Sequence, residues 1–222
     1  MNKQEISAAL YGFINQIYWA EDLRPDESIK NLEESVVELT MCGRHSSNGL
    51  MITEDGYFLT AKHCIDGDIR YLQVRLSNGR SYNISHVCVQ SDKEDVALVK
   101  AEVPGRCRPK KYRIFNTNKI KSLPAAIMLR KDGKVNTKHG FMKEYEEAFC
   151  YDTNQKNRKY PEHHFQLQLM GGKPGDSGGV VVDTDGRLIG ILSGGIETSA
   201  NGIKIMKALE FIDLYIRKRL LD

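Results

Sequence analysis

The sequence predicts an all-β protein with helices at its two ends. Hairpin-turn dipeptides separate short apolar runs at Asp55-Gly56, Asn78-Gly79, Asp132-Gly133 and Asp185-Gly186. The run from residue 71 to 76 alternates inward and outward side chains, as a half-buried strand does. The chain has 222 residues, a length that suits a double barrel sharing one site, and its 19 glycines agree with the many turns of such a fold.

Residues 1–35 are expected to form a helical extension. An apolar stripe at helical spacing comprises Ile6, Leu10, Phe13 or Ile14, and Ile17, and it ends near Trp19. A second short helix is predicted to start at Pro25, because proline fits the first turn of a helix. We favour packing of this helical hairpin on the barrels. The alternative is a docking or regulatory arm for a partner protein.

The rest of the chain is expected to divide into a first barrel at 36–105, an inter-barrel linker at 106–122, a second barrel at 123–205 and a C-terminal helix at 206–222. The linker carries a basic cluster of Arg106, Arg108, Lys110, Lys111 and Arg113. We expect this charge to be solvated, an acidic partner surface being the alternative. The last helix is indicated by an apolar stripe at Leu209, Ile212, Ile216 and Leu220.

Composition excludes several classes of function. The formal net charge of +3 is too small to argue for nucleic acid. No apolar run is long enough for a membrane span or a signal peptide. The five cysteines are odd in number and scattered, so we expect reduced thiols in a cytoplasmic protein.

No metal or organic cofactor is expected. The histidines other than His63 are interpreted as structural or surface groups, because no cysteine or carboxylate lies at the short intervals that a zinc site favours. These histidines are His45, His86, His139, His163 and His164.

One serine is placed as a nucleophile is usually placed. Ser177 lies in the run Lys-Pro-Gly-Asp-Ser-Gly-Gly at residues 173–179, whose glycines free the backbone around it. A serine hydroxyl needs a base to take its proton, and His63 fits that role. Asp95, at the start of an apolar strand, would hold the imidazole in the right tautomer. The backbone amides of Gly175 and Ser177 would bind the negative oxygen of the tetrahedral intermediate.

At these motifs the chain resembles the trypsin-like (chymotrypsin-fold) serine peptidases. Gly175-Asp176-Ser177-Gly178-Gly179 matches their nucleophile motif, and the segments 61–64 and 95–98 parallel their histidine and aspartate motifs. The segment 48–60 looks like the hairpin that leads to the histidine in single-chain bacterial members such as the high-temperature-requirement proteases. The resemblance covers roughly residues 37–216. It implies two antiparallel six-stranded β-barrels and a protein or peptide substrate.

The resemblance also implies where a substrate binds. The primary pocket would be walled by the segment before the serine and by Ser193, Gly194 and Gly195, with its floor near Lys204. Gly171 occupies the position that carries an aspartate in trypsin, so a preference for Arg or Lys has no obvious anchor. Lys204 would favour an acidic residue if it pointed to the floor, although a strand lysine is more often solvent-facing.

The sequence departs from the family pattern in two places. Secreted members bridge the cysteine after the histidine to one about sixteen residues earlier, but Asn48 stands at that position, so the usual disulfide looks absent. Pairing of Cys42 with Cys64 under oxidation is the alternative, if the two lie close enough. Secreted trypsins also pair the aspartate before the serine with a new N-terminus. Here Asp176 is expected to be exposed, paired with a lysine such as Lys173, or held only when a partner binds.

Three hypotheses follow from the sequence. The leading one is a serine endopeptidase with a restricted intracellular protein substrate, regulated through a partner at the N-terminal helices. The second is an inactive protease fold that acts as a binding or chaperone-like module. The third is a basic adaptor that uses residues 106–121. The complete triad favours the first hypothesis.

Overall fold

Six strands close the first barrel in the computed structural model of the chain. The structure describes residues 3–16, 23–115, 122–144, 148–150, 158–160, 164–168, 170–196 and 198–220. Ile17, Trp19, His163 and residues 116–121 of the expected linker lie outside this part. The strands are β1 (Val36–Met41), β2 (Arg44–Met51), β3 (Tyr57–Thr60), β4 (Leu72–Arg75), β5 (Ser81–Ser91) and β6 (Val96–Ala101).

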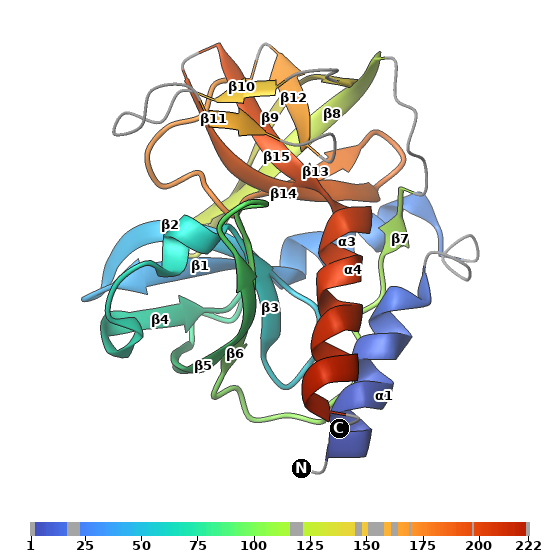
Figure 1. Cartoon of the computed structure of the whole chain (residues 1–222). Coiled ribbons are helices and arrows are strands. Elements are labelled where there is room, and N and C mark those ends of the chain that lie inside the picture. Colours follow the sequence, from blue (N-terminus) through green and yellow to red (C-terminus); the bar gives the residue numbers. More distant parts are fainter. Residues whose placement is uncertain are drawn as a thin grey trace.

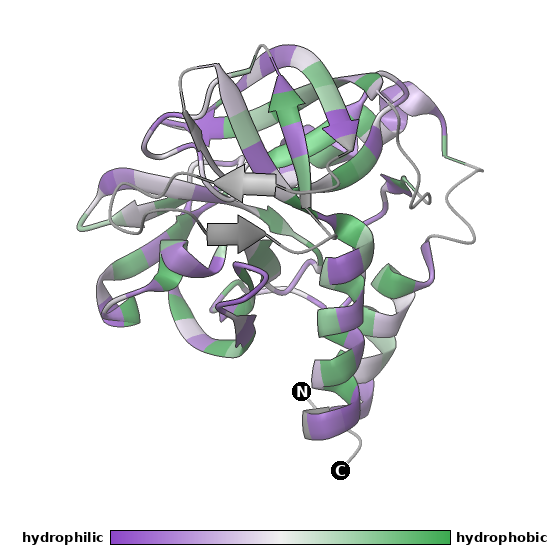
Figure 2. Ribbon diagram, turned by 45° about the horizontal axis from the view of Figure 1, so that its top comes forward, coloured by the Kyte–Doolittle hydropathy of each residue, from purple (hydrophilic) through white to green (hydrophobic). Residues whose placement is uncertain are grey.

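The first barrel closes in the order β1-β2-β3-β6-β5-β4, and each neighbouring pair is antiparallel. Its interior is filled by inward-facing side chains such as Leu39, Phe58 and Val99, all of which are buried. Figure 2 shows both green and purple positions along the strands of this barrel, as is expected where one face of a strand meets the core and the other meets solvent. β3 and most of β6 are buried along their length, which fixes the segments that follow β3 and precede β6.

The second barrel has the order β13-β8-β9-β12-β15-β14, and a β13–β14 pairing closes it. Its strands are β8 (Ser122–Lys131), β9 (Lys134–Glu144), β12 (His164–Gln168), β13 (Val180–Asp183), β14 (Arg187–Ile196) and β15 (Ser199–Lys204). Within the linker, β7 (Arg113–Ile114) adds a short parallel strand beside β14. β10 (Ala148–Cys150) and β11 (Arg158–Tyr160) pair separately. The predicted fold class, two antiparallel six-stranded barrels with terminal helices, is confirmed.

The helices lie along one side of the two barrels, where α1 (Lys3–Ile14) runs beside α4 (Ile205–Tyr215) (Figure 1). Leu10 and Phe13 of α1 are fully buried, and the ring of Phe13 meets Tyr112 of the linker edge-on at 6.1 Å between centroids. α3 (Pro25–Ser35) packs against β1, β2 and β14, and a π-helical turn, η4 (Ile216–Leu220), ends the described chain. The N-terminal helices therefore contribute to the core, as the favoured alternative predicts.

No helix within the described ranges is both long and apolar enough to cross a bilayer.

Candidate active site

Three segments that are distant in sequence meet where the two barrels face each other. His63 lies in a 3-10 helix, η2 (Lys62–Ile65), directly after β3, and Asp95 directly precedes β6. Ser177 lies in the loop 173–179 that leads into β13. The loop is tied to both barrels, because the Ser177 carbonyl accepts from the Asn48 amide at 2.7 Å and the Gly178 amide donates to the Leu192 carbonyl at 2.7 Å.

Asp95 orients His63. Its Oδ1 accepts hydrogen bonds from the His63 amide and from His63 Nδ1, both at 3.0 Å, and its Oδ2 lies 2.9 Å from the same Nδ1. The Ser193 hydroxyl donates to the Oδ2 of Asp95. A proton on Nδ1 leaves Nε2 as the nitrogen able to take a proton from a nucleophile. The Asp95 side chain is 8% exposed and that of His63 is 48% exposed, so a buried anion supports a base that a substrate can reach.

The two groups shift each other's pKa in opposite directions. Burial alone would lower the pKa of His63, but the hydrogen bonds to Asp95 and to the Cys64 sulfur outweigh it and raise the pKa above its ordinary value. Burial alone would raise the pKa of Asp95, but its bonds to His63 and Ser193 lower it. The carboxylate therefore stays ionised beside an imidazole that holds its proton more strongly than a free histidine does.

The glycines around Ser177 are required by space and by conformation. Gly175 and Gly178 have φ values of +95° and +77°, in the left-handed region. A Cβ at Gly178 would lie 1.8 Å from the Asn48 carbonyl oxygen, so no other residue fits there. This close approach carries the nucleophile loop onto the first barrel, where the same Cβ would also lie 2.7 Å from the hydroxyl oxygen of Thr60.

Two backbone amides of this loop are available to an oxyanion. The Asp176 amide donates to the Lys173 carbonyl at 2.9 Å, and the Gly179 amide donates to the Asp176 carbonyl at 3.0 Å. Among the described residues, the amides of Gly175 and Ser177 have no such partner. These are the two donors that the sequence predicts for the oxyanion hole.

The hydroxyl of Ser177 makes no hydrogen bond to any residue in the described part of the chain. The contact that His63 Nε2 does make is with the Sγ of Cys64, at 3.8 Å. Catalytic contacts are often long before substrate binds and tighten in the complex. The structure thus joins His63, Asp95 and Ser193 by hydrogen bonds and places Ser177 on the nucleophile loop. The hydrogen bond between the Ser177 hydroxyl and His63 Nε2, through which the proton would be transferred, is not formed.

Asp176, the residue before the nucleophile, is held by a lysine of β9. Lys138 Nζ lies 2.5 Å from Asp176 Oδ2 and 3.1 Å from the Gly171 carbonyl. The Lys173 amide donates to the same carboxylate at 2.8 Å. Of the three states expected for Asp176, the structure shows pairing with a lysine, but that lysine is Lys138, and Lys173 contributes only its backbone.

The residues expected to line the primary pocket lie together in the second barrel. β14 supplies Ser193, Gly194 and Gly195, and the Gly171 carbonyl is held by Lys138. An ideal Cβ at Gly172 would lie 2.8 Å from the Cα of Gly195, so these two walls touch in this state. Lys204 is 8% exposed, in contrast to the solvent-facing position that is usual for a strand lysine.

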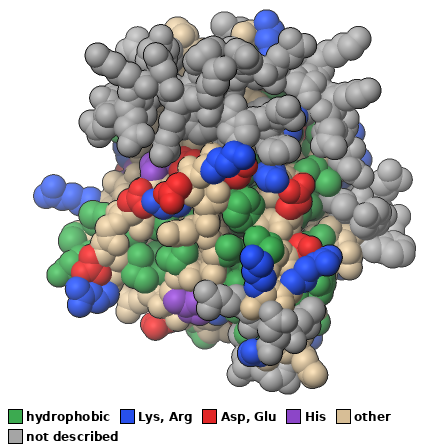
Figure 3. Space-filling view, in the orientation of Figure 1, with side chains coloured by type: hydrophobic (Ala, Val, Ile, Leu, Met, Phe, Trp, Pro, Cys, Tyr) green, Lys and Arg blue, Asp and Glu red, His purple; other side chains and the backbone are tan. Residues whose placement is uncertain are grey.

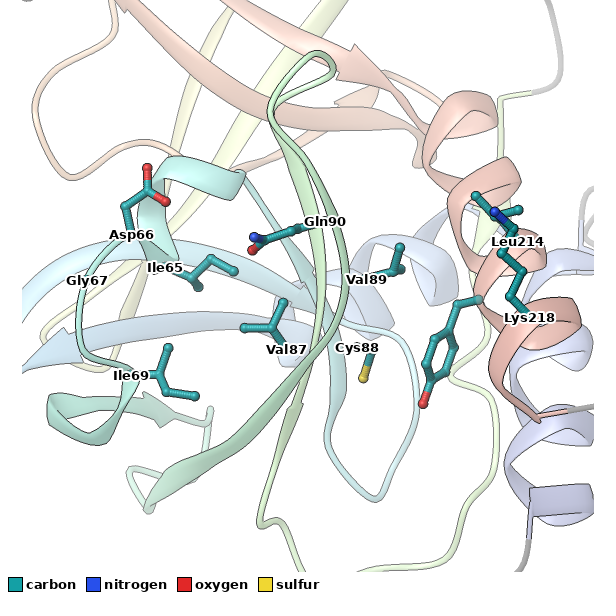
Figure 4. Close-up of a pocket in the computed structure, with 11 residues that line it drawn as sticks. Ile65, Asp66, Gly67, Ile69, Val87, Cys88, Val89, Gln90, Leu214 and Lys218 are labelled. Atoms are coloured by element: carbon teal, nitrogen blue, oxygen red, sulfur yellow. The ribbon is translucent and has the colours of Figure 1, made fainter. Parts of the chain in front are cut away.

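A hollow of about 740 Å³ lies on the first barrel beside the 3-10 helix that carries His63 (Figure 4). Its walls come from the loop after that helix, from β5 and from the end of α4. Ile65, Val87 and Leu214 contribute apolar surface, while Asp66 and Lys218 lie toward its two ends. None of the triad residues lines it, so it is separate from the catalytic arrangement.

Comparison with known proteins identifies the family. The model of the trypsin-like peptidase domain matches residues 47–191, which include His63, Asp95 and Ser177. The chain therefore belongs to the trypsin-like peptidases, and it is a trypsin-like serine protease.

Solved structures of proteases share the fold. A serine endoprotease from Yersinia pestis is 19% identical with a TM-score of 0.66, over 87% of this chain and 67% of the other. An HtrA-type protease, an AlgW variant with a tripeptide, is 20% identical with a TM-score of 0.65, over 88% of this chain and 64% of the other. This chain thus spans about two thirds of their length. No curated protein sequence matches the chain significantly.

Four residues contribute to the site although the sequence does not indicate their roles. These are Lys138, Cys64, Asn48 and His45, which lies beside Gly175. Asn48 was visible only as the residue that replaces a cysteine, and Lys138 is one of several lysines in a polar strand. The contacts of Lys138, Asn48 and His45 join residues that are far apart in the chain, which local patterns do not encode.

Because the pKa of His63 is raised, the rise of the reaction rate with pH should lie at a higher pH than an ordinary histidine would give. The imidazole must be neutral to accept the Ser177 proton, so the rate of acylation should rise with pH through a pKa above 6.5. Cys64→Ala should move this rise to lower pH, because the sulfur no longer stabilises the imidazolium. The measurement is the rate of fluorophosphonate labelling against pH, with Cys88→Ala as the control thiol. If the labelling rate rose at the same pH in wild type and in Cys64→Ala, this role of the Cys64 sulfur would be contradicted.

The ion pair of Lys138 with Asp176 predicts a loss of activity on its removal. Lys138→Met should reduce the labelling rate of Ser177 roughly 10- to 100-fold, because an unpaired Asp176 would displace the loop that carries the nucleophile. Lys138→Arg should restore part of the rate, since it restores the charge. Lys134→Met, an exposed lysine on the same strand, is the matched control. A Lys138→Met protein that is folded and labels at the control rate would refute this role.

Proposed function

We propose that the chain is a serine endopeptidase that acts through an acyl-enzyme on Ser177. His63 Nε2 takes the hydroxyl proton as Ser177 attacks the peptide carbonyl, and the amides of Gly175 and Ser177 bind the resulting oxyanion. His63 then gives the proton to the leaving amine, and a water attacks the ester by the same route. The observation that carries the proposal is the bidentate contact of Asp95 with His63 Nδ1, which sets the tautomer this chemistry needs.

The proposal includes a site that forms without cleavage of the chain. Lys138 supplies a positive charge to Asp176 from within the folded barrel, which supports a constitutive nucleophile loop. We further propose a restricted protein substrate and action inside the cell. The four thiols whose side chains are described, Cys42, Cys64, Cys88 and Cys107, are all free, in keeping with a reducing compartment. A regulatory partner at α1 or α3 would use their outward faces, since the inward faces are buried.

An inactive binding module is the second candidate. Two observations favour it: the Ser177 hydroxyl lacks a hydrogen bond among the described residues, and the backbones of Gly172 and Gly195 meet where a substrate side chain would enter. A nucleic-acid adaptor has less support, because Lys and Arg lie interspersed with Asp and Glu on the face shown in Figure 3. Both alternatives predict that peptide bonds stay intact.

Fluorophosphonate labelling separates these functions. The purified full chain should be labelled at Ser177 alone, as located by mass spectrometry, because the triad makes this hydroxyl the reactive one. Ser177→Ala should abolish labelling, and Asp95→Asn should slow it by up to roughly 10⁴-fold, because the imidazole tautomer is lost. Folded wild-type protein that takes no label over the pH range in which His63 is neutral would support the binding module instead.

A further inference from the structure

The hollow on the first barrel is built from the two segments that adjoin the catalytic pair. Residues of the segment 65–69, which follows His63, form one wall, and the end of α4 forms the opposite wall. Residues 87–90 of β5, which precede Asp95 in the chain, run between the two walls (Figure 4). The volume of about 740 Å³ lies within the range of ordinary binding pockets, roughly 300–1,000 Å³.

The edge of β5 that borders this hollow is unpaired within the described part of the chain. β4 pairs with β5 only at residues 81–83, whereas on the other edge β6 pairs with β5 as far as Ser91. Along residues 85–91, alternate N–H and C=O groups of the second edge therefore have no backbone partner among the described residues. Such an edge is a template for a further strand.

This edge has few of the features that usually keep a sheet edge without a partner. Charged side chains and proline are common ones. The stretch 85–91 reads Ser-His-Val-Cys-Val-Gln-Ser and contains no lysine, arginine, aspartate, glutamate or proline. The ladder with β6 shifts register on either side of residues 86 and 87, and beyond the second shift residues 89–91 pair in regular succession. A straight stretch of edge is therefore left open.

Apolar surface lies on both sides of the open edge. Val87 points to the side of Ile65 and Ile69 (Figure 4). Val89 points to the opposite side, toward α4, where Leu214 is 40% exposed. The side chains of an added strand would alternate between the same two sides. The edge therefore fits an extended peptide with apolar residues at successive positions, since both faces of that peptide would be covered.

The charges around the hollow define the ends of such a peptide. Lys62 Nζ lies 2.6 Å from both Asp66 Oδ1 and Asp92 Oδ1, so one ammonium is shared by two carboxylates. The end of the hollow at Asp66 and Gln90 is thus negative on balance. On the α4 side, Lys218 is exposed and makes no ion pair with any described residue. Charge complementarity then calls for a basic residue at the first end and an acidic residue on the α4 side.

We propose that the hollow is a docking site for an extended segment of a partner protein, which adds as a strand to residues 85–91 of β5. The segment is a run of apolar residues with a basic residue at the Asp66 end and an acidic residue facing Lys218. Main-chain hydrogen bonds to the β5 edge supply affinity, and the two apolar sides supply selectivity. The site goes beyond the proposed function, because binding here uses no residue of the triad. An occupant contacts both segments that adjoin the catalytic pair.

The first test selects peptides on Ser177→Ala protein. From a phage-displayed library of random ten-residue peptides, those that bind this protein but not its Leu214→Asp derivative should share the apolar run and the two end charges. Leu214→Asp should weaken their binding roughly 10-fold or more, because it places a charge on one apolar side of the hollow. Met41→Asp, which changes a 41% exposed apolar residue outside the hollow, is the matched control and should leave binding unchanged.

Two results of the selection would overturn the inference. One is that no peptide distinguishes the Leu214→Asp derivative from its parent. The other is that the selected peptides are lost equally on the Met41→Asp derivative.

A charge exchange at Lys218 places the occupant without disturbing the core, because this side chain is exposed. Lys218→Glu should weaken the selected peptides roughly 2- to 5-fold, as expected for an exposed ion pair. It should strengthen by a similar factor the peptide in which lysine replaces the acidic residue. Affinities that keep their wild-type order would refute the placement.

Methylation of the peptide backbone tests strand addition itself. An N-methyl group removes the N–H, and in an antiparallel pair only alternate N–H groups face the partner strand. N-methylation at alternate positions should therefore abolish binding to Ser177→Ala protein in isothermal titration, and methylation at the positions between them should be tolerated. Equal effects at successive positions would overturn the inference. None of these measurements needs activity, so a failure of Ser177 labelling in wild type would overturn only the proposed function.

Discussion

The geometry of the site depends on Asn48, which joins the nucleophile loop to the first barrel through both its backbone and its side chain. Its amide donates to the Ser177 carbonyl and its carbonyl accepts from the Thr60 hydroxyl, both at 2.7 Å. Its side chain donates to Gly175 and accepts from Arg130. Asn48 is buried, and unmade hydrogen bonds at such a position cost about 1–3 kcal/mol each, so all four contacts constrain one another.

Two consequences follow from this constraint. The absence of a disulfide at this position is compensated by hydrogen bonds, which need no oxidising compartment. The loop is also gripped from both sides, because Asn48 and His45 hold it on the first barrel while Lys138 and the amide pairing with Leu192 hold it on the second. A loop fixed in this way keeps two amides available to an oxyanion before substrate arrives, which is what electrostatic preorganisation requires.

The sequence predicts much of this arrangement, for identifiable reasons. His63 and Asp95 adjoin apolar runs that form β3 and β6, and Ser177 lies between glycines whose positive φ values its motif anticipates. Alternation and turn dipeptides predict the strands and hairpins, and the resemblance to the trypsin-like peptidases predicts that these strands form two barrels. These signals are local, so they survive in a single sequence.

The sequence could not predict contacts and burial that depend on strands far apart in the chain. His45 looked structural because its partner, Gly175, is 130 positions away in the chain. Lys138 reaches Asp176 because of the register of β9, which the sequence does not reveal. Lys204 is buried, although a strand lysine is more often solvent-facing. Each of these features depends on strands that come together only in the folded protein.

The most direct test of the Asn48 constraint is the labelling rate of Asn48→Asp, measured beside its unfolding midpoint. The aspartate keeps an acceptor for Arg130 but cannot donate to the Gly175 carbonyl. The account predicts a folded protein whose Ser177 labels roughly 10- to 100-fold more slowly than wild type, because the oxyanion loop has lost one of its anchors. A folded Asn48→Asp protein that labels at the wild-type rate would contradict it.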